Sequence, residues 1–336
     1  MDAKITKKRL SHLLSYDWLK VIGVILAGIL VWSLLFTMTA TKMKPSQQFS
    51  VVNYKGTALT TAFSDRFNAT MSAPKLFSHE VIEISVVDTT TGGDEMVSSL
   101  METRLATDEG DVAFAANVID PDTEYVKKGA EKGEKFYYTY LESMLRGYYQ
   151  YIYRIDGDDG ILAKMENYLN VYFGDYTAEN ATLDEAKLEK DFRSKVKRAK
   201  DKRYKTESSI KTAVNGEIKR LNDYRNGLIE FYGYIEKGYI TYQETTLDFT
   251  EAYSGGSVYT GVYSLNICPN EDTMGSLKEI IYHVEERENE DGTKTNVSTA
   301  KDINLAFLNT PKMDKNYQYE SILYVNYLVK TYCSAL

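Results

Sequence analysis

Cysteine and histidine are scarce in this chain of 336 residues, which contains two cysteines and three histidines. Neither cysteine belongs to a C-x-x-C pair, and the histidines, His12, His79 and His283, lie far apart in the sequence. Structural zinc sites combine four cysteine or histidine ligands, usually at short spacings. The sequence therefore contains no recognisable ligand set for zinc, and we expect no bound metal.

The two cysteines leave two possibilities open. If the C-terminal part of the chain is exported, Cys268 and Cys333 form one disulfide, provided that the fold brings them together. Otherwise both are buried free thiols. Their positions in the sequence do not decide between these alternatives.

A net positive charge is also missing. The chain has 40 Lys and Arg residues against 48 Asp and Glu residues, which gives a net charge of −8. Proteins that bind nucleic acid neutralise its phosphates with a basic face. We therefore expect no nucleic-acid partner.

Motifs for nucleotide binding and for common catalytic sites are absent as well. The sequence has no G-x-x-x-x-G-K-[ST], no spaced G-x-G-x-x-G, no G-x-S-x-G and no H-E-x-x-H. These patterns place the groups that bind phosphates, attack carbonyls or hold zinc. We expect no cofactor and no enzymatic activity, although paired carboxylates can act in catalysis without leaving a sequence motif.

Long apolar runs are missing everywhere except at Val21–Ala40, which has twenty residues, no charge and no proline. About 20 helical residues cross the hydrocarbon core of a bilayer, so this run predicts a transmembrane helix in contact with membrane lipid. Basic residues are more numerous before the run than after it, which predicts a cytoplasmic N-terminus and an extracytoplasmic C-terminal body. Those before it are Lys4, Lys7, Lys8, Arg9 and Lys20; those after it are Lys42, Lys44 and Lys55.

A cleaved signal peptide is the alternative interpretation of this run. Its apolar region is usually 7–15 residues long and ends at a small-x-small cleavage site. Here the run is longer, and cleavage after Ala40 would place Met38 at the upstream small position. We therefore predict an uncleaved single-pass signal anchor in the cell membrane, with a basic cytoplasmic or interfacial segment at 1–20 and a linker at 41–48.

The section 49–120 alternates between strand and helix patterns. Strands are predicted at Phe49–Tyr54, Val81–Asp88 and Asp111–Asn117, and helices at Thr57–Asn68 and around Met96–Leu105. Such alternation is typical of a parallel α/β unit with right-handed crossovers. We predict that this section forms the first part of an α/β lobe.

The section 121–238 has helical patterns throughout. Helices are predicted at Phe136–Ile155, at Ile161–Phe173, after a capping box at Thr182–Glu185, and at Ile210–Ile235. This section is predicted to be a large all-helical insertion, arranged as a helical pair or small bundle.

The section 239–336 returns to strand patterns and completes the lobe. The predicted elements are strands at Tyr239–Leu247, Ser257–Ile267, Glu279–Glu288, Thr293–Val297 and Ile303–Leu308, and a closing helix at Tyr317–Tyr332. Together with the anchor, the predicted fold is an α/β domain with a mixed sheet and a helical insertion.

Two compositional features have alternative interpretations. Tyrosine is abundant, with 28 residues, which fits either half-buried surfaces or a contact surface for a ligand or partner. The stretch Lys187–Lys205 contains ten basic residues. It is either a solvated helix face, paired in part with nearby acids, or a surface that contacts anionic lipids or polymers.

Ligands of open α/β sheets bind at the carboxyl ends of the strands. The second loop here leads into a helix N-terminus, where free backbone N–H groups favour anions; an ordinary Ser/Thr/Gly turn is the alternative. The loops at these ends supply the predicted ligand-binding residues, which are Tyr54, Lys55, Asp88, Thr89, Thr90, Thr91 and Asn117.

The order of strands and helices, with Glu109-Gly-Asp-Val-Ala-Phe114 leading into the third strand, resembles the opening lobe of a type II extracellular (periplasmic) solute-binding protein. The return to strands and a terminal helix after Gly238 is similar to the way such proteins complete that lobe. Where such proteins have a second α/β lobe, this chain has the helical section. The resemblance implies a membrane-anchored, solute-binding-like protein with an atypical second lobe.

Two functions follow as hypotheses. In the first, the protein binds or senses a small ligand next to a membrane transporter. In the second, it is a non-enzymatic structural or interaction protein, and the helical insertion docks a partner in a membrane complex. A ligand receptor should have a deep cleft at the strand ends. A scaffold should have that crevice filled by side chains and an exposed apolar patch on the helices.

Overall fold

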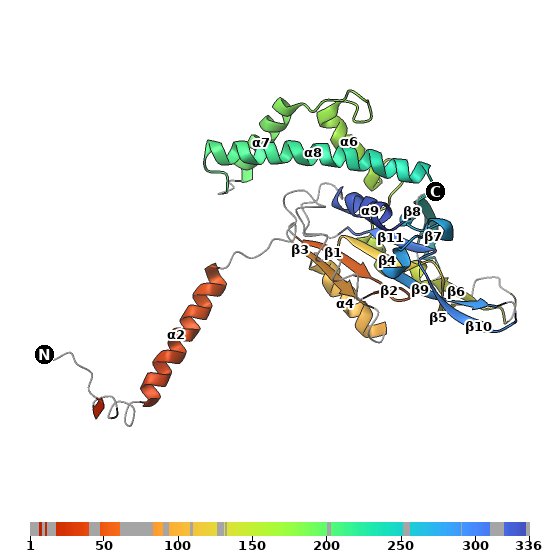
Figure 1. Cartoon of the computed structure of the whole chain (residues 1–336), viewed down its shortest axis with the longest axis horizontal. Coiled ribbons are helices and arrows are strands. Elements are labelled where there is room, and N and C mark those ends of the chain that lie inside the picture. The colour runs from red at the N-terminus through yellow and green to blue at the C-terminus, as the bar shows by residue number, and fades with distance from the viewer. Residues whose placement is uncertain are drawn as a thin grey trace. The chain divides into compact units, whose positions relative to one another are not determined.

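The computed structural model describes residues 7–8, 11, 18–39, 48–60, 83–89, 94–107, 110–125, 131, 133–199, 203–250, 256–289, 291–309 and 319–333. The chain divides into two compact units, Met1–Lys44 and Pro45–Leu336. The first unit contains an apolar helix, and the second contains the sheets and the remaining long helices (Figure 1).

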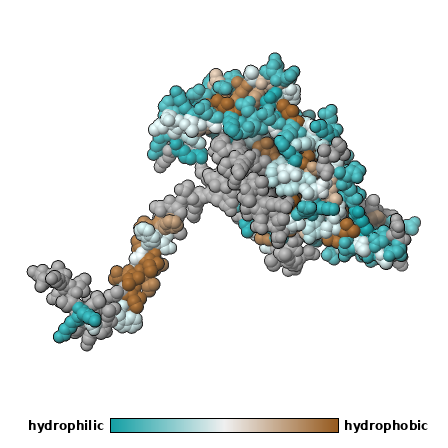
Figure 2. Space-filling model, in the orientation of Figure 1, coloured by the Kyte–Doolittle hydropathy of each residue, from teal (hydrophilic) through white to brown (hydrophobic). Residues whose placement is uncertain are grey.

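The apolar helix α2 extends over Trp18–Thr39, a length of 22 residues. At a rise of 1.5 Å per residue it is ~33 Å long, close to the ~30 Å thickness of a hydrocarbon core. Its large side chains are exposed, and Figure 2 shows it covered by hydrophobic residues. Within the described part of the chain, α2 alone is long and apolar enough to cross a membrane, although an N-terminal signal sequence has the same properties. The predicted apolar helix is confirmed; its insertion and orientation stay predictions.

The second unit is built around a six-stranded mixed sheet with the strand order β3-β1-β4-β11-β8-β7. Strand β1 pairs in parallel with β3 and β4, whereas β11 is antiparallel to β4 and β8, and β7 is antiparallel to β8. The predicted α/β fold with a mixed sheet is therefore confirmed. The strands are β1 (Gln48–Asn53), β3 (Glu83–Asp88), β4 (Val112–Ala116), β7 (Thr241–Asp248), β8 (Val258–Asn266) and β11 (Ile303–Phe307).

Both faces of this sheet are buried. On β4, Val112 and Phe114 belong to one hydrophobic core, and Ala113 and Ala115 belong to the other. Helices α4 (Asp94–Ala106) and α5 (Tyr140–Tyr148) pack on the alanine side. Helices α6 (Ile161–Phe173), α8 (Glu207–Glu236) and α9 (Tyr319–Tyr332) supply the core on the other side. A strand that is covered on both faces has a continuous run of apolar residues in its sequence, which explains why β4 was recognisable from the sequence.

Helix α8 is buried mainly in its C-terminal half. Its buried residues are Val214, Leu221, Tyr224, Gly227, Leu228 and Phe231. At Gly227 it approaches α9 so closely that an added Cβ would lie 2.5 Å from the side chain of Leu323. Asn326 of α9 donates a hydrogen bond to the Gly227 carbonyl, at 2.7 Å. The N-terminal half of α8 instead packs against α7 (Glu185–Ala199).

The N-cap of α7 differs from the prediction. The sequence suggested a capping box that begins at Thr182, but the helix starts at Glu185, and the side chain of Asp184 accepts a hydrogen bond from the Lys187 N–H at 2.9 Å. A capping side chain must immediately precede the first helical residue, which is the position of Asp184. Helix α8 has a reciprocal box between Thr206 and Ser209.

Two smaller sheets show that two sequence predictions were wrong. Section 121–238 is not all helical, and the segment that begins the helix predicted at Thr57–Asn68 contains a strand. Strand β5 (Ile119–Tyr125) pairs with β6 (Phe136–Thr139), so the helix predicted at Phe136–Ile155 is reduced to α5, a short 3-10 turn and an isolated bridge. Strand β2 (Ala58–Leu59) pairs with β9 (Ile281–Glu288), which pairs with β10 (Lys294–Thr299). The tyrosine-rich segment at β6 suits strand and helix equally, and cross-strand pairing decides between them. The rest of the helix predicted at Thr57–Asn68, and linker residues 41–47, lie outside the described residues.

Candidate functional site

The predicted ligand-binding residues lie at one edge of the six-stranded sheet, where the parallel strands β1, β3 and β4 end. From β1 the chain reaches β3 on one side and later β4 on the other. The carboxyl ends of β1 and β4 therefore form a topological switch point, the place where open α/β sheets form binding crevices. Tyr54 and Lys55 follow β1, Asp88 ends β3 and Thr89 follows it, and Asn117 follows β4. Thr90 and Thr91 lie outside the described residues.

The end of β1 is occupied by hydrogen bonds within the chain. The Asn53 amide donates to Asp88 at 3.3 Å, and its oxygen accepts from the Thr57 hydroxyl at 2.5 Å. The Thr89 hydroxyl and N–H both donate to the Asn53 carbonyl, at 2.8 Å and 3.0 Å. Asn53, Thr57 and Thr89 are all buried. These side chains tie β1 to β3 and are not directed toward a ligand.

Lys55 is held by a buried carboxylate. Its Nζ lies 2.9 Å from Oδ2 of Asp120, whose side chain is fully buried. The next residue, Gly56, has a φ of +84°, and a Cβ there would lie 2.2 Å from the ring of Tyr140. Tyr140 therefore packs directly on the backbone at the switch point, and the space beside Lys55 is filled.

Tyr54 and Asn117 are also held by contacts within the α/β body. Tyr54 is buried beneath the sheet, where its ring meets Tyr148 edge to face with centroids 6.3 Å apart. The Asn117 N–H donates to the carbonyl of Asp302, at 2.9 Å, in the turn before β11. The predicted ligand-binding residues that the structure describes therefore lie at one edge of the sheet. Side chains of the α/β body, however, pack against that edge. Sequence analysis missed Asn53, Thr57 and Asp120, which were recognisable only as polar residues near strand ends.

Both cysteines are free thiols in the structure. Burial raises the pKa of Cys268 to about 12 and that of Cys333 to about 11. Cys268 follows β8 and Cys333 follows α9, and both contribute to the same hydrophobic core. A disulfide between them was one of the two possibilities that the sequence left open, and it stays untested.

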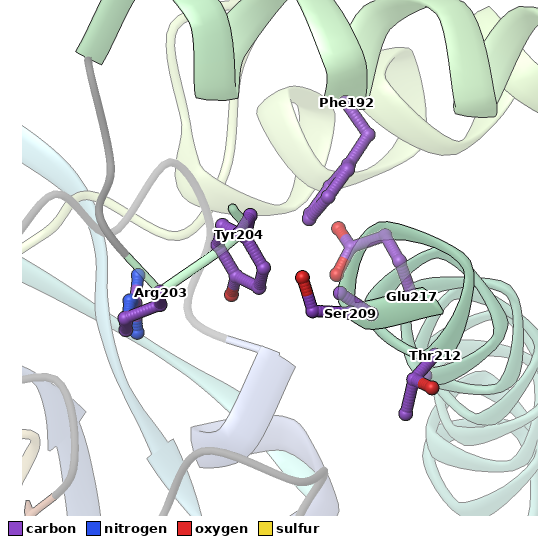
Figure 3. Close-up of a pocket in the computed structure, with 8 residues that line it drawn as sticks. Phe192, Arg203, Tyr204, Ser209, Thr212 and Glu217 are labelled. Atoms are coloured by element: carbon purple, nitrogen blue, oxygen red, sulfur yellow. The ribbon is translucent and has the colours of Figure 1, made fainter. Parts of the chain in front are cut away.

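A cavity of about 490 Å³ lies elsewhere, between α7, the residues that precede α8 and the first turns of α8. Figure 3 shows Phe192 reaching down from α7, with Tyr204 beside it and Ser209 and Glu217 of α8 opposite. The lining residues are Phe192, Arg203, Tyr204, Ser209, Thr212, Ala213, Gly216 and Glu217. Two of these are aromatic and four are polar or charged, so the cavity has both apolar and polar walls.

Aromatic contacts set the shape of this cavity. The rings of Phe192 and Tyr204 meet edge to face, with centroids 5.3 Å apart. The Arg203 guanidinium lies over the Tyr204 ring, 5.1 Å from its centroid. Edge-to-face pairs and cation–π contacts restrict the orientation of their partners, and each contributes about 0.5–1 kcal/mol. These residues form a preformed aromatic wall.

An ion pair holds α7 against the start of α8. Arg193 of α7 pairs with Glu207 of α8 at 2.5 Å, and it also pairs with Glu189 of its own helix at 2.6 Å. The Arg193 guanidinium lowers the pKa of the Glu207 carboxyl. On the floor of the cavity, Glu217 pairs with Arg220. A group inside the cavity would therefore meet the Glu217–Arg220 pair and the Arg203 guanidinium, and exposed basic residues lie on the outer surface of α7.

Within the described residues there is no group of three or more His, Cys, Asp or Glu side chains placed to hold a metal ion. Comparison with protein families, with curated proteins and with solved structures finds no match for this chain.

The packed strand edge generates a testable prediction. Replacing Lys55 by Met should destabilise the domain by about 3 kcal/mol, because Asp120 is left as a buried carboxylate without its cation. Urea unfolding of the fragment Pro45–Leu336 would measure this change. Lys278→Met, at an exposed position, should stay within about 0.5 kcal/mol of the parent. An equally small effect for Lys55→Met would contradict a structural role for Lys55.

Proposed function

We propose that this chain is a membrane-anchored, non-enzymatic interaction protein that docks a partner protein through its helical arm. The helical arm is defined as α7 together with residues 203–217, which include the first turns of α8. The α/β body acts as the platform that holds the arm. Helix α2 anchors the protein as a single-pass membrane segment, with the N-terminus in the cytoplasm and the body outside.

One contrast carries this proposal. The polar groups at the strand edge form hydrogen bonds and an ion pair within the body, whereas the helical arm has an open cavity with aromatic walls. Buried Asn53, Thr57 and Thr89 leave little for a small ligand to contact. Interfaces, in contrast, are enriched in aromatic residues and arginine, the residue types found at Phe192, Tyr204 and Arg203.

The arm is also poorly buried, as expected of a surface that contacts something outside the domain. Leu188 is the buried side chain of α7 that joins the main core, and Val214 is the buried residue in the first turns of α8. In Figure 1, α7 and the N-terminal end of α8 extend beyond the sheet. Helices packed mainly on each other are stabilised further when a partner covers them.

Site-specific crosslinking tests this proposal. Replacement of the exposed Lys197 by photoreactive p-benzoylphenylalanine in the full-length protein, in intact cells, should give a discrete adduct with one partner after illumination. The same probe at the exposed Lys278 of the α/β body should not give that adduct. The proposal fails if Lys197 yields no adduct or the same products as Lys278.

The topology has a separate test. Protease added to intact cells should digest the α/β body and leave the short N-terminal segment protected, because positive charge before α2 favours retention inside. Cells opened with detergent serve as the control for complete digestion. Protection of the body in intact cells would overturn the predicted orientation.

Binding of a small solute beside a transporter is the second candidate function. What favours it is the topological switch point between β1 and β4, the usual place for a ligand in an open α/β sheet. Residues 61–82 and 90–93 lie outside the described residues. In this candidate, Lys55 and Asn117 border the ligand.

A thermal-shift screen of Pro45–Leu336 against amino acids, sugars, peptides and metabolites tests the second candidate. A ligand at 100 times its Kd stabilises the native state by about 2.7 kcal/mol, which shifts Tm by roughly 4 °C in a domain of this size. A genuine ligand should lose this shift in Asn117→Ala but not in Lys278→Ala. No shift with any compound would contradict solute binding.

A further inference from the structure

We propose that the β5–β6 hairpin is a lid over the strand edge, and that the Asp120 carboxylate occupies the place of a ligand carboxylate on Lys55. The lid is defined as the described residues 119–125, 131 and 133–139. Displacement of the lid lets a small carboxylate bind to Lys55. This proposal rests on the second candidate function, solute binding at the switch point, and is independent of docking by the helical arm.

Asp120 brings its carboxylate to the place where open α/β sheets bind ligands. Lys55 follows β1 at the switch point, and its Nζ lies 2.9 Å from Oδ2 of Asp120. Tyr140 comes directly after the lid and packs on Gly56, and the centroid of its ring lies 6.0 Å from the Lys55 Nζ. A small carboxylate in place of Asp120 would therefore meet a cation and the ring of a tyrosine.

The lid is weakly attached to the α/β body. None of its described residues belongs to either hydrophobic core, and Asp120 is the one buried residue among them. Ile119, the neighbour of Asp120 in β5, is 65% exposed. A two-stranded hairpin is marginally stable by itself, and segments with few buried apolar contacts open at a lower free energy than the core. The lid therefore opens without unfolding of the six-stranded sheet.

Firmly held elements lie at both ends of the lid. Before it, β4 ends at Ala116 inside the six-stranded sheet. After it, α5 begins at Tyr140 and buries four of its side chains. The Tyr140 N–H donates to the carbonyl of Val118 at 3.0 Å, so the two ends of the lid lie together. Rotation of the backbone at Val118 and Thr139 lifts the lid and leaves Tyr140 beside Lys55.

Stacked side chains form a latch that keeps the lid closed. The rings of Tyr125 and Tyr138, one from each strand of the lid, stack with centroids 4.1 Å apart. The Arg146 guanidinium of α5 lies 4.5 Å from the ring centroid of Tyr138 and 5.2 Å from that of Phe249. Arg146 also donates to the carbonyl of Asp248 at 2.6 Å. It thus ties the lid to the end of β7 through contacts that are separate from the buried ion pair.

A carboxylate is the ligand group that replaces Asp120 with the least change at Lys55. Burial of an ion pair costs hydration that the attraction of the two charges only partly returns. Exchange of one carboxylate for another keeps the charge balance at Lys55 and returns Asp120 to water. The ring of Tyr140 remains as an apolar wall, which favours a ligand with an apolar or aromatic body. Benzoate is a simple probe that has both groups.

Isothermal titration calorimetry on the full-length protein in nanodiscs of zwitterionic lipid tests the proposal. Benzoate is the probe, and benzamide is its uncharged counterpart. A closed site lowers the apparent affinity by the fraction of molecules that are open, so Asp120→Asn should bind benzoate about tenfold more tightly than the parent. Benzamide should bind neither protein. The proposal is overturned if Asp120→Asn does not bind benzoate, or binds benzamide or inorganic phosphate as tightly.

Matched variants separate the latch from the site. Arg146→Met loosens the latch, keeps the buried ion pair and should tighten benzoate binding about threefold. Lys135→Met removes an exposed ion pair with Glu124 inside the lid and should leave the affinity unchanged. The double variant Lys55→Met, Asp120→Asn has no buried charge without a partner, so it should fold but lose benzoate binding. Equal affinities of Arg146→Met and Lys135→Met would contradict the latch.

Hydrogen exchange followed by mass spectrometry tests the opening itself. In the parent, amides of β5 and β6 should exchange at least about tenfold faster than those of β4, because opening the lid needs less free energy than unfolding the six-stranded sheet. Saturating benzoate should speed exchange in the lid of Asp120→Asn and leave β4 unchanged, because the ligand favours the open state. Exchange in the lid as slow as in β4 would overturn the proposal.

The thermal-shift screen distinguishes failure of the lid from failure of solute binding. If the screen finds a ligand that binds the parent and Asp120→Asn equally well, solute binding stands and only the lid fails. If neither protein binds benzoate or any compound of the screen, the second candidate function fails as well. Benzoate binding that tightens in Asp120→Asn and is lost in the double variant supports both.

Discussion

Burial of both faces of the six-stranded sheet is the constraint on which the rest of the structure depends. The central strands β1, β4 and β11 send apolar residues to both sides, so each face must be covered by helices. Residues of α4 and α5 cover one face, and residues of α6, α8 and α9 cover the other. Helix α8 is longer than the sheet face that it covers. Its N-terminal part therefore does not pack on the sheet, and this part forms the arm together with α7.

Helix α8 therefore has two roles along its 30 residues. Its C-terminal half is fixed by close approach to α9 at Gly227 and by the stacked rings of Tyr224 and Tyr319, whose centroids are 4.3 Å apart. Its N-terminal half is held mainly by α7 through Arg193 and Glu207. The C-terminal half of α8 attaches the arm rigidly to the α/β body, and the N-terminal half lines the cavity. A scaffold needs this combination, because docking on a fixed surface costs less ordering entropy.

The strand edge shows how a fold can retain the topology of a binding site while its side chains serve stability. The switch point at β1 and β4 is present, but Asn53, Thr57 and Thr89 use their polar groups on each other, and Lys55 neutralises Asp120. Each of these groups would be costly to bury without its partner. Tyrosine has a similar role in the core, where Tyr224, Tyr319 and Tyr324 are almost completely buried. These three tyrosines are core residues and belong neither to half-buried surfaces nor to a contact surface.

The sequence by itself determined the features that depend on neighbouring residues. These are the apolar helix α2, the strands β1, β3, β4, β8 and β11, the long helix α8 and the closing helix α9, each marked by an apolar run or a regular apolar spacing. Only the tertiary structure decided what depends on residues far apart in the chain. Phe136–Thr139 became a strand because β5 lies beside it, and the strand edge was closed because Asp120 and Tyr140 reach Lys55 and Gly56. The cavity exists because Phe192 of α7 and Ala213 of α8 line the same space between two helices, and no local pattern records such an arrangement.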